Sequence, residues 1–156
     1  MRDAVRLRGM RDHGEDPRPA RGAVREVYDV RRAAALEYSP DLDGLADPGE
    51  IVWAWVPYEE DSSRGKDRPL LLVGRHGRRV LGMMLTSREP DRGYEDESLE
   101  LGSGSWDRDG RVSYLRLDRI FDLDEDDIRR EGAVLDGERF ARVAAVLHHR
   151  FGWGFA

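Results

Sequence analysis

Short apolar runs separated by turn-forming residues dominate the sequence from residue 50 onward. Ile51–Val56 is apolar at every position, and Leu70–Val73 repeats this pattern after a polar stretch. Runs of this length predict strands that are covered on both faces. Further strand candidates are Val80–Ser87, 98–104, Ser113–Phe121 and Gly132–Leu135. Residues 74–79, with two glycines among basic residues, predict a hairpin turn between two of these strands.

One helix is predicted near the C-terminus. Asp136 suits the N-cap position, because its carboxylate can accept hydrogen bonds from the first backbone N–H groups. Apolar side chains then recur at helical spacing: Phe140, Val143, Ala144, Leu147 and Phe151. Gly152 is expected to end the helix. Five or six short strands followed by this helix predict a mainly β fold, a small twisted barrel with a C-terminal α-helix.

The N-terminal third of the chain has a different character. Residues 1–22 are rich in Arg, Pro and Gly and lack apolar periodicity, which predicts a partly disordered arm. Residues 23–30 alternate in part and form a possible strand, and residues 39–49 read as a turn-rich linker. We therefore expect an N-terminal extension over residues 1–47 and a barrel domain over residues 48–156.

Composition narrows the possible functions. The 156 residues include no cysteine, which excludes disulfides and thiolate chemistry. No apolar run approaches the length of a membrane span, and the first residues lack the pattern of a signal peptide, so we expect a cytoplasmic protein without a membrane partner. The formal net charge is −6, yet residues 61–92 are locally basic. A local basic patch can still attract phosphate groups.

A row of hydrogen-bond donors precedes the apolar strand Leu70–Val73. These donors are Ser63, Arg64, Lys66 and Arg68. Arg68 is the most informative of them, because Pro69 disfavours helix at residue 68 and stiffens the backbone there. Arg68 can be a loop residue paired with one of the acids Glu59, Glu60 or Asp61, or it can bind a phosphate oxygen through its planar guanidinium.

Thr86 and Ser87 end the third predicted strand, and Arg88 follows them. Hydroxyl groups at a strand end are often satisfied by the backbone of the turn. If the strands that contain Leu70 and Val80 form a hairpin, however, Arg68 and Thr86 fall at its open end. The hairpin then brings a cation and a hydroxyl group together.

No metal site is predicted. The four histidines are scattered, and the acidic run Asp122–Asp127 lacks the mid-loop glycine and the closing glutamate of a calcium loop. Acidic residues that open a short helix account better for this run.

The order of these motifs resembles the MazF/PemK ribonuclease toxins. The resemblance rests on Gly49-Glu50-Ile51-Val52-Trp53, a polar loop over 57–67, the dipeptide Arg68-Pro69, and the later segments 85–89, 115–121 and 131–147. It implies an SH3-like barrel that forms a homodimer, is bound by a cognate antitoxin protein, and cleaves single-stranded mRNA without a metal or other cofactor.

The resemblance also implies roles for particular residues. Arg68 and Thr86 take the two catalytic positions, and the predicted RNA-binding residues around them are Ser63, Arg64, Lys66, Ser87 and Arg88. The attacking group in this family is the 2′-hydroxyl of the RNA itself. Two features depart from the family: the loop has no readily placed acidic partner for Arg68, and the extension has no counterpart in compact relatives.

A second function remains open, a catalytically silent SH3-like module that binds a protein or nucleic acid. The acidic surplus and the poorly matched loop favour it. Glu59, Glu60 and Asp61 should repel phosphate, so we expect them either to turn away from an RNA path or to hold arginines in place.

Overall fold

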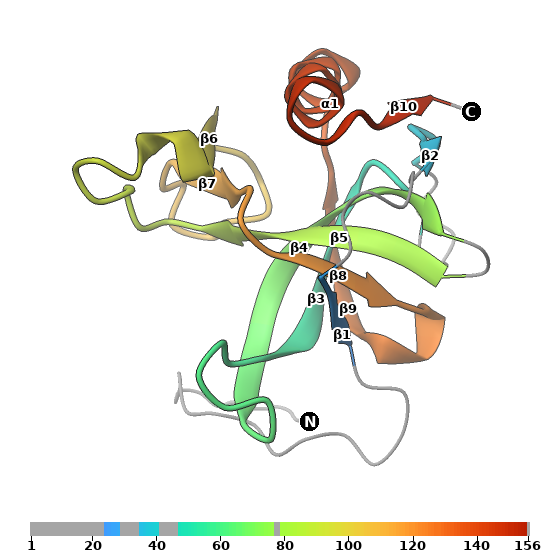
Figure 1. Ribbon diagram of the computed structural model, residues 1–156, viewed down its shortest axis with the longest axis vertical. Coiled ribbons are helices and arrows are strands. Elements are labelled where there is room, and N and C mark those ends of the chain that lie inside the picture. Colours follow the sequence, from blue (N-terminus) through green and yellow to red (C-terminus); the bar gives the residue numbers. More distant parts are fainter. Residues whose placement is uncertain (1–23, 29–34, 41–46, 77–78, 156) are drawn as a thin grey trace.

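The computed structural model describes residues 24–28, 35–40, 47–76 and 79–155 of the chain. These residues form a curled, mainly antiparallel sheet and one helix, α1 (Gly137–Phe151), as Figure 1 shows. The strands are β1 (Arg25–Val27), β2 (Ala35–Leu36), β3 (Glu50–Pro57), β4 (Gly65–His76), β5 (Arg79–Thr86), β6 (Ser98–Gly102), β7 (Ser113–Arg116), β8 (Ile120–Leu123), β9 (Ile128–Val134) and β10 (Gly154–Phe155). The prediction of a mainly β fold with a C-terminal helix is confirmed.

β4 is the central strand of the barrel. It pairs with β3 on one edge and with β5 on the other, both antiparallel. β5 continues the sheet to β8 and, at its other end, to β7, whereas β3 pairs with β9. The strands therefore wrap around a core, and the loop between β3 and β4 lies at the opposite end of the molecule from α1 (Figure 1).

The two faces of the sheet bury separate apolar clusters. Along β4, Leu71 and Val73 belong to the larger cluster, and Leu70 and Leu72 to the smaller one. Alternate side chains of a strand point to opposite faces, which explains this division. Four buried apolar side chains of α1 belong to the larger cluster: Phe140, Val143, Ala144 and Leu147. Asp136 caps the helix, accepting the N–H of Arg139 at 3.0 Å, and Gly152 ends it with φ of 78°.

The predicted strand Ser113–Phe121 is wrong as a single element. β7 ends at Arg116 and β8 begins at Ile120, with a bend between them. Leu117 and Arg119, within this bend, are both buried. The apolar residues that suggested one continuous strand serve two strands in different parts of the sheet.

β4 begins earlier than its apolar pattern suggests. Gly65 already pairs with Pro57, so the β3–β4 loop spans only residues 58–64 rather than 57–67. A side chain at position 65 would lie 2.2 Å from the carbonyl oxygen of Val56, so glycine permits this close approach. Lys66 and Arg68 are therefore strand residues. The predicted turn of the next hairpin includes residues 77 and 78, which lie outside the described residues.

Parts of the N-terminal extension join the sheet. β1 pairs with β8, and β2 pairs with both β4 and β10. The described part of the extension thus adds two strands to the sheet; the predicted arm 1–22 lies outside the described residues. Within the described residues, no helix is long and apolar enough to cross a membrane.

Candidate functional site

The β4–β5 hairpin carries the two residues of the candidate site. Its paired residues end at Leu70 and Met84; Arg68 lies two residues before Leu70, and Thr86, two residues after Met84, pairs with Tyr114 of β7. On its other edge Arg68 pairs with Ala54 of β3. Arg68 and Thr86 are half-buried, at the point where the strands leave the core. Arg68 and Thr86 thus both lie just beyond the paired part of the hairpin, and their convergence at one site stays a prediction.

Arg68 lies among other charged groups. Burial lowers the pKa of Arg68 below its ordinary value, and the nearby guanidinium groups of Arg116 and Arg119 lower it further, against the opposing effects of Tyr58 and Glu60. An arginine remains protonated despite such a shift. We call these three arginines the arginine cluster.

Arg116, the last residue of β7, is held by a carboxylate. Its Nε donates to Oδ1 of Asp118 at 3.0 Å, and a second nitrogen of its guanidinium also binds Asp118. This hydrogen bonding raises the pKa of Arg116, and the charges of Asp118, Glu59 and Glu97 raise it further. Arg116 is not evident as a site residue from the sequence, because the apolar pattern of residues 113–121 predicts one continuous strand. Alternation with buried Leu115 and the acid two positions later were the available signals.

Arg119 is the most enclosed member of the arginine cluster, with a side chain 5% exposed. It donates to both carboxylate oxygens of Glu26, at 2.8 and 3.2 Å, and to the carbonyl oxygen of Pro57 at 3.1 Å. Its guanidinium carbon also lies 4.8 Å from the centre of the Phe121 ring. Sequence reasoning missed this residue too, since nothing local indicates that a charged side chain in a bend is buried.

Thr86 has a backbone partner in the turn that follows β5. Its Oγ1 accepts the N–H of Arg88 at 3.1 Å, which is the local satisfaction expected for a hydroxyl group at a strand end. A threonine hydroxyl has a donor besides its acceptor lone pairs, so this bond leaves the O–H able to donate. Thr86 also pairs with Tyr114 across the β5–β7 ladder.

The other predicted RNA-binding residues are spread around this site. Ser63 lies in the β3–β4 loop, where its Oγ donates to Oδ1 of Asp61 at 2.6 Å. Arg64 ends that loop, and Lys66 pairs with Val56 within the sheet. Ser87 and Arg88 are exposed after β5, and Arg88 forms an ion pair with Asp91 at 3.5 Å.

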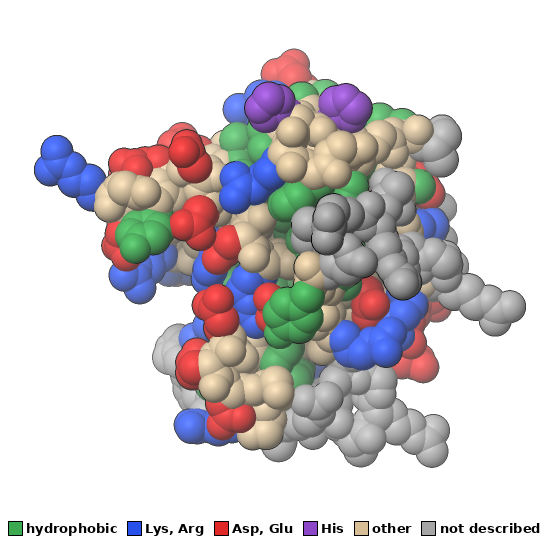
Figure 2. All heavy atoms as spheres, in the orientation of Figure 1, with side chains coloured by type: hydrophobic (Ala, Val, Ile, Leu, Met, Phe, Trp, Pro, Cys, Tyr) green, Lys and Arg blue, Asp and Glu red, His purple; other side chains and the backbone are tan. Residues whose placement is uncertain are grey.

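The acidic half of the β3–β4 loop acts on the arginines. Glu60 influences Arg68 and Glu59 influences Arg116 through charge. Asp61 instead accepts hydrogen bonds from Ser63 within the loop. Figure 2 shows the wider pattern, with acidic and basic side chains interspersed rather than sorted into one basic patch. Within the described residues, no group of three or more histidine or acidic side chains is arranged to hold a metal ion.

The fold and the site together define a small β-barrel protein with a cationic cluster at the open end of its central hairpin. The sequence profile for the PemK-like, MazF-like toxins of type II toxin–antitoxin systems matches residues 47–151, about two thirds of the chain. The chain belongs to this family, as its motifs indicated, and its fold is consistent with the SH3-like barrel implied by that resemblance. No protein with a curated description matches the chain.

Membership defines the broad class of function. Toxins of this family are generally endoribonucleases, they have a cognate antitoxin as partner, and they are typically dimeric. The matched region begins at residue 47, so β1 and β2 lie outside it.

Proposed function

We propose that this protein is the toxin of a type II pair and cleaves single-stranded mRNA in the cytoplasm without a metal ion. The observation that supports this most directly is that Arg68 and Thr86 both lie just beyond the paired end of the β4–β5 hairpin, with the charges of Arg116 and Arg119 acting on Arg68. Phosphoryl chemistry needs positive charge where negative charge develops, and clustered guanidinium groups supply it.

The reaction is a transesterification within the RNA. The 2′-oxygen forms a bond to the adjacent phosphorus while the bond from phosphorus to the 5′-oxygen breaks. The products are a 2′,3′-cyclic phosphate and a free 5′-hydroxyl. The 2′-hydroxyl loses a proton and the departing 5′-oxygen gains one, so no water is consumed.

Each residue has a role that suits its chemistry. Arg68 binds the phosphate oxygens and stabilises the charge that grows on them, while the Thr86 hydroxyl donates to one of these oxygens. Arg116 adds a second guanidinium. Arginine is a poor base at neutral pH. Asp118, bonded to Arg116, is a carboxylate of the site with the chemistry of a proton acceptor.

The proposed partners follow from the same site. A homodimer would present two copies of Arg68 and Arg116 to RNA, and a segment of the cognate antitoxin would cover them and block cleavage. Ser63, Arg64, Lys66, Ser87 and Arg88 are the proposed RNA contacts around the reacting phosphate. Co-expression with the product of a neighbouring small reading frame tests the antitoxin, which should bind the toxin and suppress cleavage.

The deciding experiment is incubation of the purified full chain with long single-stranded RNAs in EDTA. We expect discrete cuts with 5′-hydroxyl ends that fall about 100-fold or more in Arg68→Ala, the loss typical of removing one oxyanion donor. Arg111→Ala is the matched control, because Arg111 is exposed and pairs with Asp107 away from the cluster. Cuts that persist in Arg68→Ala overturn the site. No cutting on several diverse RNAs favours a silent binding module instead.

A further inference from the structure

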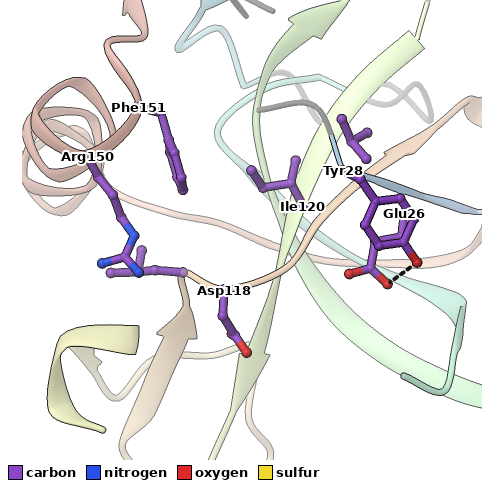
Figure 3. A pocket seen from close by; sticks show the side chains of 8 residues that line it. Glu26, Tyr28, Asp118, Ile120, Arg150 and Phe151 are labelled. Carbon is purple, nitrogen blue, oxygen red and sulfur yellow. Dashed lines mark hydrogen bonds between the residues drawn. The ribbon is translucent and has the colours of Figure 1, made fainter. Parts of the chain in front are cut away.

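A carboxylate on β1 contacts the arginine cluster, although β1 lies outside the region that matches the family. Glu26 is the central residue of β1 and pairs with Phe121 of β8. Its two carboxylate oxygens each accept a hydrogen bond from the Arg119 guanidinium, at 2.8 and 3.2 Å. The Glu26 carboxylate lines a pocket of about 290 Å³ and accepts a hydrogen bond from the Tyr28 hydroxyl at 3.4 Å. Figure 3 shows these two side chains at the wall of the pocket.

Arg119 needs such a partner because its guanidinium is almost fully enclosed. A buried cation is tolerated when a carboxylate and further hydrogen bonds satisfy it, and removing that carboxylate leaves an uncompensated charge. Glu26 therefore fixes where the Arg119 guanidinium lies. The same guanidinium donates to the carbonyl oxygen of Pro57, the last residue of β3.

Pro57 connects this pair to the candidate site. It pairs with Gly65 at the base of the β3–β4 loop, and the next residue, Tyr58, donates its N–H to the carbonyl of Arg64 at 2.8 Å. Glu60 of this loop acts on Arg68 through charge. A continuous chain of contacts thus runs from β1 through Arg119 to the loop beside Arg68.

We propose that Glu26 is a positioning residue for RNA cleavage, acting through Arg119 to hold the β3–β4 loop and the arginine cluster in their reactive arrangement. This inference rests on the proposed ribonuclease function. It assigns part of the site to the N-terminal extension, because β1 lies outside residues 47–151.

The kinetic constants of Glu26→Gln distinguish a positioning role from simple charge repulsion of RNA, because the two roles change different constants. Glu26→Gln keeps the shape of the side chain and removes one negative charge near the RNA path. Loss of that charge alone favours RNA binding, so it lowers KM and leaves kcat unchanged. Loss of positioning lowers kcat, by about tenfold or more, because a displacement of about 1 Å can cost about 100-fold. We expect kcat to fall while KM does not rise.

The test compares four full-length proteins with the natural chain. They carry Glu26→Gln, Arg119→Gln, both substitutions, or Arg25→Gln. Arg25 is the matched control, since it neighbours Glu26 on β1 but is exposed and pairs with Asp122. If Glu26 acts through Arg119, Glu26→Gln has little further effect once Arg119 is replaced. Equal effects of Glu26→Gln in both backgrounds, or a change in KM alone, overturn the proposal.

A second measurement keeps this test independent of activity. Hydrogen exchange at the Tyr58 amide reports the base of the β3–β4 loop directly. We expect faster exchange in Glu26→Gln than in Arg25→Gln, with the core strands of both proteins equally protected. If the natural chain cuts no RNA, the proposed function fails, yet this comparison still decides whether Glu26 positions the loop. Unchanged exchange at Tyr58 overturns that role.

Discussion

Arg116 and Asp118 form a hydrogen-bonded ion pair across the end of β7, with Nε and Oδ1 separated by 3.0 Å. Arg119 has a carboxylate of its own in Glu26, whereas the acidic group that acts on Arg68 through charge is Glu60. Arg116 and Arg119 are thus held in place by short contacts, and their positive charges act on Arg68, beyond the paired end of the hairpin. This arrangement leads to four predictions about the proposed nuclease and its fold.

A lysine at position 68 should make cleavage sensitive to pH. The site lowers the pKa of a cation at this position, mainly through burial. Arginine stays charged regardless, but a lysine begins from an ordinary pKa of about 10.4 and is lowered from there. The Arg68→Lys protein should therefore lose kcat as pH rises through this lowered pKa, while the natural protein does not. Cleavage rates from about pH 6 to about pH 10 measure this difference. Parallel profiles would contradict it.

Substitutions of Thr86 should show whether cleavage depends on its hydroxyl group or on the shape of its side chain. Thr86→Val removes the proposed donor and should lower kcat about tenfold to 100-fold, whereas Thr86→Ser should retain most activity. Thr86→Val also removes the acceptor for the N–H of Arg88, at a cost of about 1 kcal/mol in unfolding free energy. Cleavage assays together with denaturant unfolding separate these two effects. Equal activity of the two variants would rule out a role for the hydroxyl.

Arg116 should contribute to the salt dependence of RNA binding. Each phosphate neutralised on a single strand contributes about 0.7 to the slope of log affinity against log salt concentration. Arg116→Gln should reduce that slope by about this amount. Arg111→Gln, in which an exposed arginine away from the cluster is changed, should leave it unaltered. An oligonucleotide with a 2′-deoxy sugar at the cleavage position allows the measurement without turnover. A full slope in Arg116→Gln would remove Arg116 from the RNA path.

Gly65 should be intolerant of any side chain. A Cβ atom there would lie 2.2 Å from the carbonyl oxygen of Val56 and 2.9 Å from the Pro57 Cα. Because backbone atoms must then move, Gly65→Ala should destabilise the fold by about 2 kcal/mol or more. Gly154→Ala is the control, since no atom lies within 4 Å of its added Cβ. Thermal unfolding of both variants measures the difference, and similar Tm values would contradict the close approach.

The sequence predicted the elements whose signals are local. The apolar run Ile51–Val56 lies within β3, and Asp136 and Gly152 bound α1 as their capping chemistry requires. Asp124 caps the short 3-10 helix Glu125–Asp127, so the acidic run does open a helix. In each case the residues that decide the structure lie within a few positions of one another.

The sequence was misleading where distant residues decide the structure. Gly65, Lys66 and Asp67 have little strand propensity, yet pairing with β3 makes them strand residues. Arg119 is polar, yet Glu26, 93 residues earlier, allows its burial. The β4–β5 hairpin followed from local pairing, whereas the convergence of Arg68 and Thr86 at its open end stays a prediction. Arg116 and Arg119 lie at a bend that periodicity did not reveal.

Because β1 and β2 come from the N-terminal extension, the folded unit begins earlier in the chain than the region that matches the family. A chain shortened to residues 47–156 would retain all matched positions but would leave the outer edge of β8 without β1. It would also deprive buried Arg119 of its carboxylate, a loss that typically costs about 3–5 kcal/mol. Trimming this protein to its recognisable domain would therefore yield a less stable molecule, and an inactive shortened chain would not be evidence of an inactive toxin.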